Sequence, residues 1–151
     1  MEDDSFEAYD ASPAFRRGHA TRLAVLGPEY VEGSVRRGAR EAFTHDLQQI
    51  VNEHVWGSVW SREGLSLAKR SIVVITILAM RGQEDELGLH IAGGLRNGLT
   101  AEELREVFLQ VAAYAGMPAC LLAFKAARQP LADAGISLET LMSESPSRAS
   151  D

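Results

Sequence analysis

The amino-acid sequence predicts an all-α fold of about six helices joined by short connections. Apolar residues recur three or four positions apart along most of the chain, which is the spacing of one helix face. Glycine, proline and capping residues interrupt this pattern at intervals typical of helix lengths. No stretch shows a convincing strand pattern, and no segment is repeated.

In the N-terminal half, the first predicted helix spans residues 13–26 and ends at Gly27, which is followed by a proline. Residues 28–38 form a connection or a short helix. Residues 39–60 are predicted to form one strongly amphipathic helix. Its apolar face is built from residues three and four positions apart: Phe43, Leu47, Ile50 and Val51.

The next predicted helix, residues 67–82, is apolar on most sides and is expected to be buried at the centre of the fold. Its β-branched residues would also suit a strand, but its length and Ser66 as an N-cap favour a helix. Another helix is expected over residues 83–97, because Asn97-Gly98 forms a typical C-terminal stop.

A capping box begins the following helix, with Thr100 as N-cap and Glu103 three positions later. The break at "AGMP" ends this helix, and residues 119–134 form the last one. The helix that begins after Thr100 has a clear apolar face made of Leu104, Val107, Phe108, Val111 and Ala112.

The 151 residues, 46% of them hydrophobic, suit one globular domain, which we assign to residues 13–134. Residues 1–12 are acidic and are expected to be disordered, and residues 135–151 are expected to be a polar tail. Several helices are apolar over more than one face. A domain of this size has too little interior to bury all of these faces. The apolar faces left over indicate interfaces of an oligomer.

Composition also argues against several functions. The net charge of −6 argues against a broad basic surface for nucleic acid. A single cysteine, Cys120, leaves no disulfide framework, cysteine zinc site or dithiol pair. The N-terminus does not resemble a signal peptide, and the longest apolar run, Ile72 to Met80, is too short to span a bilayer. We therefore expect a cytoplasmic protein that does not bind membranes.

One histidine stands out in the segment "MRGQEDELGLHIAGGLRNGLT". His90 has Glu86 four positions earlier, on the same face of the predicted helix, where the carboxylate could orient the imidazole. By spacing alone the pair is more typical of an ordinary helix surface than of a functional site. No metal site is visible, because His45 and His54 are nine positions apart and so lie on opposite sides of a helix.

Three segments together resemble the carboxymuconolactone decarboxylase family. They are "VWGSVWSREGLSLAKRS", "ELGLHIAGGLRNGLTAEEL" and "YAGMPACLLAFKAA", and they occur in the order and at the spacings of that family, with γ-carboxymuconolactone decarboxylases as the nearest branch. The resemblance covers residues 15–133. It implies an all-α fold of alkylhydroperoxidase-D-like type with a helical hairpin core, assembled as a homo-oligomer, a trimer or hexamer.

The resemblance also implies an activity. It points to a cofactor-free lyase that decarboxylates a small carboxylated lactone such as 4-carboxymuconolactone, giving the 3-oxoadipate enol-lactone in the β-ketoadipate pathway of aromatic compound catabolism. A related branch reduces peroxides with a CxxC motif and a following histidine. The matching positions here are Gln83, Glu86 and His90, so that thiol chemistry is excluded.

Decarboxylation of such a lactone moves electrons to the lactone carbonyl, and a proton must then reach carbon. The resemblance assigns His90 as general acid or oxyanion donor, with Glu86 orienting it. Arg62 and Arg70 match family arginines and are expected to hold the second carboxylate of the substrate. The competing interpretations are a solvated loop charge for Arg62 and an intersubunit salt bridge for Arg70.

Three further side chains are candidates for substrate binding. Trp60 can wall the pocket beside the first arginine, or it can simply pack on Trp56 in the core. Tyr114 can donate a hydrogen bond into a cleft or to a backbone carbonyl. Ser58 stands where the family often has glutamate, and Leu122 where it often has asparagine.

These two departures suggest a less polar pocket than the family's. They leave open two alternatives to the lactone decarboxylase: an isomerase or tailoring enzyme that acts on a different, more hydrophobic keto or lactone acid, and a non-catalytic helical oligomer that binds a small ligand.

Overall fold

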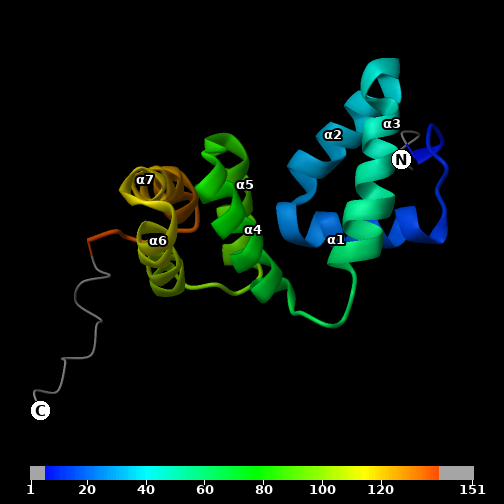
Figure 1. Cartoon of the computed structure of the whole chain (residues 1–151). Helices are drawn as coiled ribbons and strands as arrows, with labels where there is room; N and C mark the ends of the chain where they lie inside the picture. The colour runs from blue at the N-terminus through cyan, green and yellow to red at the C-terminus, as the bar shows by residue number, and fades with distance from the viewer. Residues whose placement is uncertain (1–5, 140–151) are drawn as a thin grey trace, which may run out of the picture. The chain divides into compact units, whose positions relative to one another are not determined.

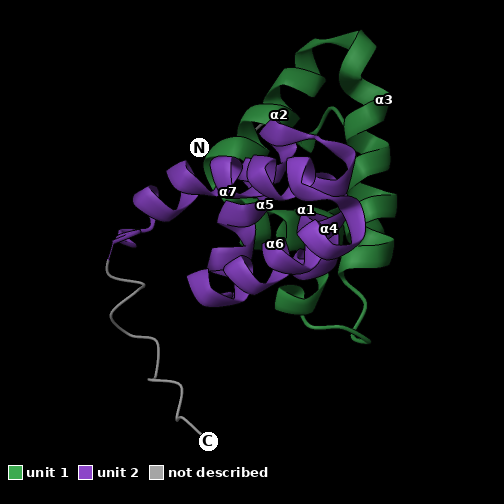
Figure 2. Cartoon of the chain, turned by 60° about the vertical axis from the view of Figure 1, so that its left-hand side comes forward, with its two compact units in different colours: residues 1–70 green, residues 71–151 purple. Residues whose placement is uncertain are grey.

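The computed structural model describes residues 6–139, which are helical along most of their length and contain no β-strand (Figure 1). The all-α prediction is therefore confirmed, and the described residues form seven α-helices and one π-helix. Two compact units, residues 1–70 and 71–151, are coloured separately in Figure 2. The elements are α1 (Pro13–Leu26), α2 (Pro28–Arg40), α3 (Ala42–Ile50), the π-helix η2 (Val51–Trp60), α4 (Leu67–Arg81), α5 (Glu84–Arg96), α6 (Ala101–Ala115) and α7 (Met117–Asp133).

In the first unit, α1 packs closely on η2 at two buried glycines. A Cβ atom on Gly18 would lie 1.8 Å from the carbonyl oxygen of Asn52, and one on Gly57 would lie 2.3 Å from that of Ala14. Only glycine permits this approach of the two backbones. The close contact fixes the end of η2 against α1, where the candidate binding groove forms.

The described part of the acidic N-terminal segment is packed against the helices of this unit. Tyr9 is buried, and its hydroxyl donates a 2.8 Å hydrogen bond to the carbonyl of Val35. Its ring stacks on Phe15 and on His45, with centroid distances of 5.3 and 4.8 Å. Residues from Phe6 onward, which the sequence assigns to a disordered segment, thus contribute to the core of the first unit.

In the second unit, α7 packs against α5 and α6. The core between them is formed by fully buried apolar side chains, among them Leu87, Ile91 and Phe108. The predicted capping box is present, since Thr100 accepts a hydrogen bond from the Glu103 amide and the Glu103 carboxylate accepts one from the Thr100 amide. The local signals at this helix start therefore operate as the sequence indicates.

The single long helix expected over residues 39–60 is present from Ala42 to Trp60. It consists of α3 and then η2, which follow one another without a break because Ile50 and Val51 both have right-handed helical backbone angles. However, its predicted apolar face is not covered by the rest of the described chain: the exposed fraction is 98% for Phe43, 55% for Leu47 and 53% for Ile50. The amphipathic pattern is present in this helix, but no described residue of this unit covers its apolar face.

A similar difference concerns α4, which was expected to be buried on most sides. One face is buried, through Ser71, Ile75 and Ala79, whereas Val73 and Ile77 on another face are about half exposed. The helix interpretation was right and the strand alternative was wrong. Among residues 6–139, no helix is long and apolar enough to cross a membrane. Most of the expected C-terminal tail, residues 140–151, lies outside the described residues.

Candidate functional site

The first unit contains an open groove of about 690 Å³ between α1 and the segment that links η2 to α4. Two predicted site residues, Trp60 and Arg62, line it, and Arg17 of α1 lines it as well. Neither guanidinium forms an ion pair with a carboxylate of residues 6–139, although Glu63 also lines the groove. The groove therefore offers two cationic groups beside an aromatic wall, which suits an anion with unsaturated or apolar carbon atoms.

Contacts between α1 and the end of η2 hold the groove in shape. The Arg17 guanidinium donates from Nε and Nη2 to the carbonyl oxygen of Gly57, at 3.2 and 3.1 Å. The hydroxyls of Thr21 and Ser61 lie 2.9 Å apart and share a hydrogen bond. The buried ring of Trp60 stacks on Trp56 with a centroid distance of 4.6 Å. The aromatic wall is therefore supported from the core.

Arg70 acts on the same linking segment. Its Nη2 atom donates a 2.8 Å hydrogen bond to the carbonyl oxygen of Arg62. Its Nε atom is buried and has no hydrogen-bond partner among the residues that the structure describes. Arg70 thus positions the backbone that carries Arg62.

His90 lies in α5 of the second unit and is partly buried, with its Nδ1 atom shielded from solvent. Burial lowers the pKa of His90 from 6.5 to about 4, because the charged imidazolium loses hydration. At neutral pH the imidazole is consequently neutral, with one ring N–H that can donate.

Glu86 does not occupy the position expected of an orienting carboxylate. Its side chain is exposed, and it forms no hydrogen bond or ion pair with another of residues 6–139. A carboxylate of Glu86 close to the ring would favour the protonated, charged form of His90. Burial of the ring instead favours the neutral form.

The remaining predicted residues are not among those that line the groove. Ser58 is exposed, and its hydroxyl donates a 2.9 Å hydrogen bond to the carbonyl of Glu53 one turn earlier in η2. Tyr114, at the end of α6, is 80% exposed. Leu122 is partly buried in α7. Within residues 6–139, no three histidine, cysteine, aspartate or glutamate side chains gather as metal ligands would.

Arg17, Thr21 and Ser61 line the groove but are not among the residues predicted from the sequence. A signal was available for two of them: Arg17, Thr21 and Ala24 stand at positions i, i+4 and i+7, which places them on one face of the first helix. Nothing in the sequence shows that this face meets residues some forty positions later.

Comparison with known proteins supports the resemblance seen in the sequence. The model of the carboxymuconolactone decarboxylase family matches residues 45–129, more than half of the chain. The chain belongs to the carboxymuconolactone decarboxylase family.

Two relatives show the type of reaction. A 4-carboxymuconolactone decarboxylase from Acinetobacter baylyi is 38% identical over 125 residues, covering 83% of this chain and 92% of that protein. A nitrosuccinic acid decarboxylase from Metarhizium robertsii is 37% identical over 119 residues, covering 79% and 82%. Since both relatives are decarboxylases, this member of the family is a carboxy-lyase.

Proposed function

We propose that this chain decarboxylates a small dicarboxylic acid that carries an electron-withdrawing group, with 4-carboxymuconolactone as the first candidate. The observation that carries the proposal is the similarity to two decarboxylases with different named substrates. Carboxymuconolactone has a lactone carbonyl and nitrosuccinic acid has a nitro group. Either group can accept the electron pair that is left when CO₂ departs. The shared requirement is therefore an electron acceptor conjugated or adjacent to the carbon that loses CO₂.

The groove of the first unit suits the binding of such an acid. Arg17 and Arg62 can hold a carboxylate that is retained in the product, and Trp60 can contact the planar, unsaturated part of the substrate. Arg70 is proposed to act indirectly, because its guanidinium holds the carbonyl of Arg62 and so the backbone beside the groove. These side chains would orient the substrate, but they would not take part in breaking its bonds.

His90 is proposed as the group that assists the chemistry, as general acid or oxyanion donor. Its low pKa favours the second role, because a neutral imidazole keeps an N–H that can donate to the negative charge developing on the acceptor group. An imidazolium acid would need a pKa nearer the working pH. Glu86 is exposed in the single chain. We propose that it orients His90 only if another copy of the chain covers this part of α5 in the assembly.

The electron flow on the lactone follows from these roles. The bond between the carboxylate and the ring carbon breaks and CO₂ leaves. The released electron pair passes through the double bond to the carbonyl oxygen, and a donated hydrogen bond stabilises the resulting dienolate. A proton then adds to carbon and restores the carbonyl group. The product would be the 3-oxoadipate enol-lactone, which places the enzyme in aromatic compound catabolism by the β-ketoadipate pathway.

Nitrosuccinic acid is the second candidate substrate, and two residues favour testing it. Ser58 and Leu122 replace polar residues common in the family, and the second relative acts on a substrate without a lactone ring. Loss of CO₂ from the carbon bearing the nitro group would give a nitronate, which the same donor could stabilise.

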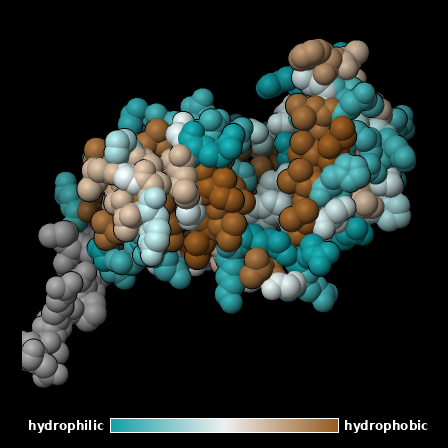
Figure 3. Space-filling model, viewed as in Figure 1, coloured by the Kyte–Doolittle hydropathy of each residue, from teal (hydrophilic) through white to brown (hydrophobic). Residues whose placement is uncertain are grey.

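We further propose that the chain assembles with copies of itself, as a trimer or hexamer. Hydrophobic side chains gather on the surface over α3 and η2 in the first unit, and over α4 and α5 in the second (Figure 3). The stripe on α3 and η2 comprises Phe43, Leu47, Ile50, Val55 and Val59, each between 43% and 98% exposed. A contiguous apolar surface of this kind is typical of a subunit interface.

The direct test is to incubate the purified protein with each candidate acid and to measure CO₂ release. We expect release from one of them. His90→Gln should lower kcat by about 10²–10³, the cost of removing one oxyanion donor. Arg62→Gln should mainly raise KM. Arg36→Gln, on the exposed surface of α2, is the matched control for the loss of an arginine and should change neither constant.

The pH profile tests the role of His90 separately. If neutral His90 donates, kcat/KM should fall with an apparent pKa near 4 on the acid side and stay level through neutral pH. A rise in activity on acidification from neutral pH would instead indicate the imidazolium as the acid. Absence of CO₂ release from either compound by folded protein would reject both named substrates.

A further inference from the structure

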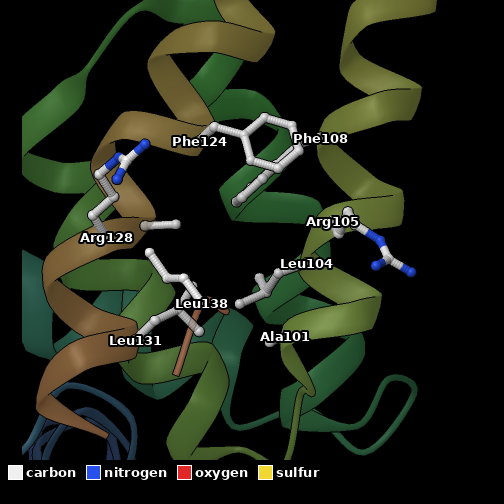
Figure 4. Close-up of a pocket in the computed structure, with 9 residues that line it drawn as sticks. Ala101, Leu104, Arg105, Phe108, Phe124, Arg128, Leu131 and Leu138 are labelled. Carbon is white, nitrogen blue, oxygen red and sulfur yellow. The ribbon is translucent and has the colours of Figure 1, made fainter. Parts of the chain in front are cut away.

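The second unit contains a separate cavity of about 260 Å³ between α6, α7 and the segment after α7 (Figure 4). Its floor consists of Leu104, Phe108 and Leu131, which are almost completely buried. Phe124 and Leu138 form part of its rim and are 38% and 43% exposed. Neither His90 nor Glu86 lines it, so the proposed decarboxylation does not use this cavity.

Two arginines line the cavity, but they differ in their partners. Arg105 is 3.4 Å from a carboxylate oxygen of Glu102 and 3.7 Å from one of Glu106, and its guanidinium is turned away from the other lining side chains in Figure 4. Arg128 lies on the opposite side, and no carboxylate of residues 6–139 forms an ion pair with it. The cavity thus combines an apolar floor with one uncompensated cation at its edge.

We propose that this cavity binds a small amphipathic monoanion, an aromatic or branched aliphatic carboxylate. The hydrocarbon part lies against Phe108 and the neighbouring leucines, and the carboxylate lies at Arg128. The volume is just below the range of about 300–1,000 Å³ typical of drug-sized ligands, so the ligand is smaller than those. One arginine without an ion pair beside an apolar floor favours a single carboxylate over the dianion proposed for the groove, because a second carboxylate would have no unpaired arginine to contact.

The occupant follows from charge complementarity and from the shape of the floor. Phe108 and Phe124 meet edge to face with a centroid distance of 5.2 Å, which leaves an aromatic surface for a planar ring. The test distinguishes a free ligand from two other occupants, the apolar pair Leu141 and Met142 of the same chain and a second copy of the protein.

The test is a titration of the full chain with 4-ethylbenzoate, followed by ¹H–¹³C spectra of the leucine methyl groups. We expect saturable shifts of the Leu104, Leu131 and Leu138 signals. Arg128→Gln should weaken 4-ethylbenzoate binding about three- to tenfold, as expected for a partly exposed charge-assisted contact. Arg105→Gln is the matched control and should leave the affinity unchanged. The uncharged 4-ethylbenzamide should bind wild type and Arg128→Gln equally.

Several outcomes would overturn the proposal. They are the absence of saturable shifts, an affinity that is insensitive to Arg128→Gln, and equal losses from the two arginine variants. Binding that occurs only in the full-length variant L141S/M142S would show that the chain's own end occupies the cavity. Shifts that depend on protein concentration without ligand would indicate a second copy. None of these measurements uses CO₂ release, so their result is independent of the proposed decarboxylation.

Discussion

At the scale of single residues, the partly buried position of His90 determines its chemistry more than its sequence neighbours do. Glu86 at i−4 would favour the charged imidazole, but that carboxylate is exposed. Burial instead lowers the pKa of His90 to about 4. This value has a consequence for stability, because the unfolded chain takes up a proton on this side chain before the folded one does.

We predict that the free energy of unfolding falls as the pH decreases from about 6.5 toward 4. The stabilisation is complete above the unfolded pKa and is lost on acidification, by at most about 1.4 kcal/mol per pH unit from this residue. Urea unfolding of wild type and His90→Gln at about pH 7 and about pH 5 measures it. The variant should lose less stability than wild type between the two values. Equal losses would mean that His90 is not buried in the folded state.

Arg17 allows a residue-scale test of the groove. Arg17→Lys keeps the charge but removes the forked contact with the Gly57 carbonyl. We expect KM for the accepted acid to rise about three- to tenfold while kcat changes little. Arg16→Lys is the control, because Arg16 is exposed and does not line the groove. An unchanged KM in the Arg17 variant would remove the groove from the substrate site.

At the scale of elements, the contact between α1 and η2 is what forms the groove. It depends on the absence of side chains at Gly18 and Gly57, because both backbones occupy the space of a Cβ atom. It is also unusual in that η2 is a π-helix of ten residues, a form that is rare and often marks functional sites. Gly57 of this helix lies against Ala14 of α1, and Trp60 at its end lines the groove.

We predict that Gly18→Ala destabilises the protein by about 3 kcal/mol or more, because its Cβ would lie 1.8 Å from the carbonyl oxygen of Asn52. Gly33→Ala in α2 is the matched control. Nothing lies within 4 Å of its Cβ, so alanine should stabilise the helix by about 0.5–1 kcal/mol. Thermal or urea unfolding compares them. Similar effects of the two substitutions would contradict the close packing of α1 on η2.

At the scale of the whole molecule, the exposed stripe on α3 and η2 gives the proposed assembly a testable surface. We predict that wild type has the mass of a trimer or hexamer in solution and that the double variant Phe43→Glu/Ile50→Glu has a lower mass. Both side chains are exposed in the single chain, so the substitutions should not disturb its fold. Light scattering after size-exclusion chromatography measures the mass.

Arg36→Glu on α2 is the control for this assembly test, since it changes charge without removing apolar surface. Its mass should equal that of wild type. A wild-type mass equal to one chain would contradict the proposed oligomer, and an unchanged mass in the double variant would place any interface elsewhere on the molecule.

The helical class, most helix ends and the family can be predicted from the amino-acid sequence. The reason is that these depend on short-range signals, such as Gly27 after the first helix or the Thr100–Glu103 capping box, and on three motifs in register. Trp60 and Arg62 could also be proposed from the sequence, because both stand in one of those motifs, and both line the groove.

Three features depend on the folded chain: which helix faces are covered, which side chains share the groove, and the lowered pKa of His90. Arg17 meets Gly57 across forty positions, and Thr21 meets Ser61 across the same separation. No local pattern encodes such contacts, because they arise from the packing of α1 on η2. The pKa of His90 likewise depends on the hydration lost on burial, which is a property of the folded chain and not of its neighbours in sequence.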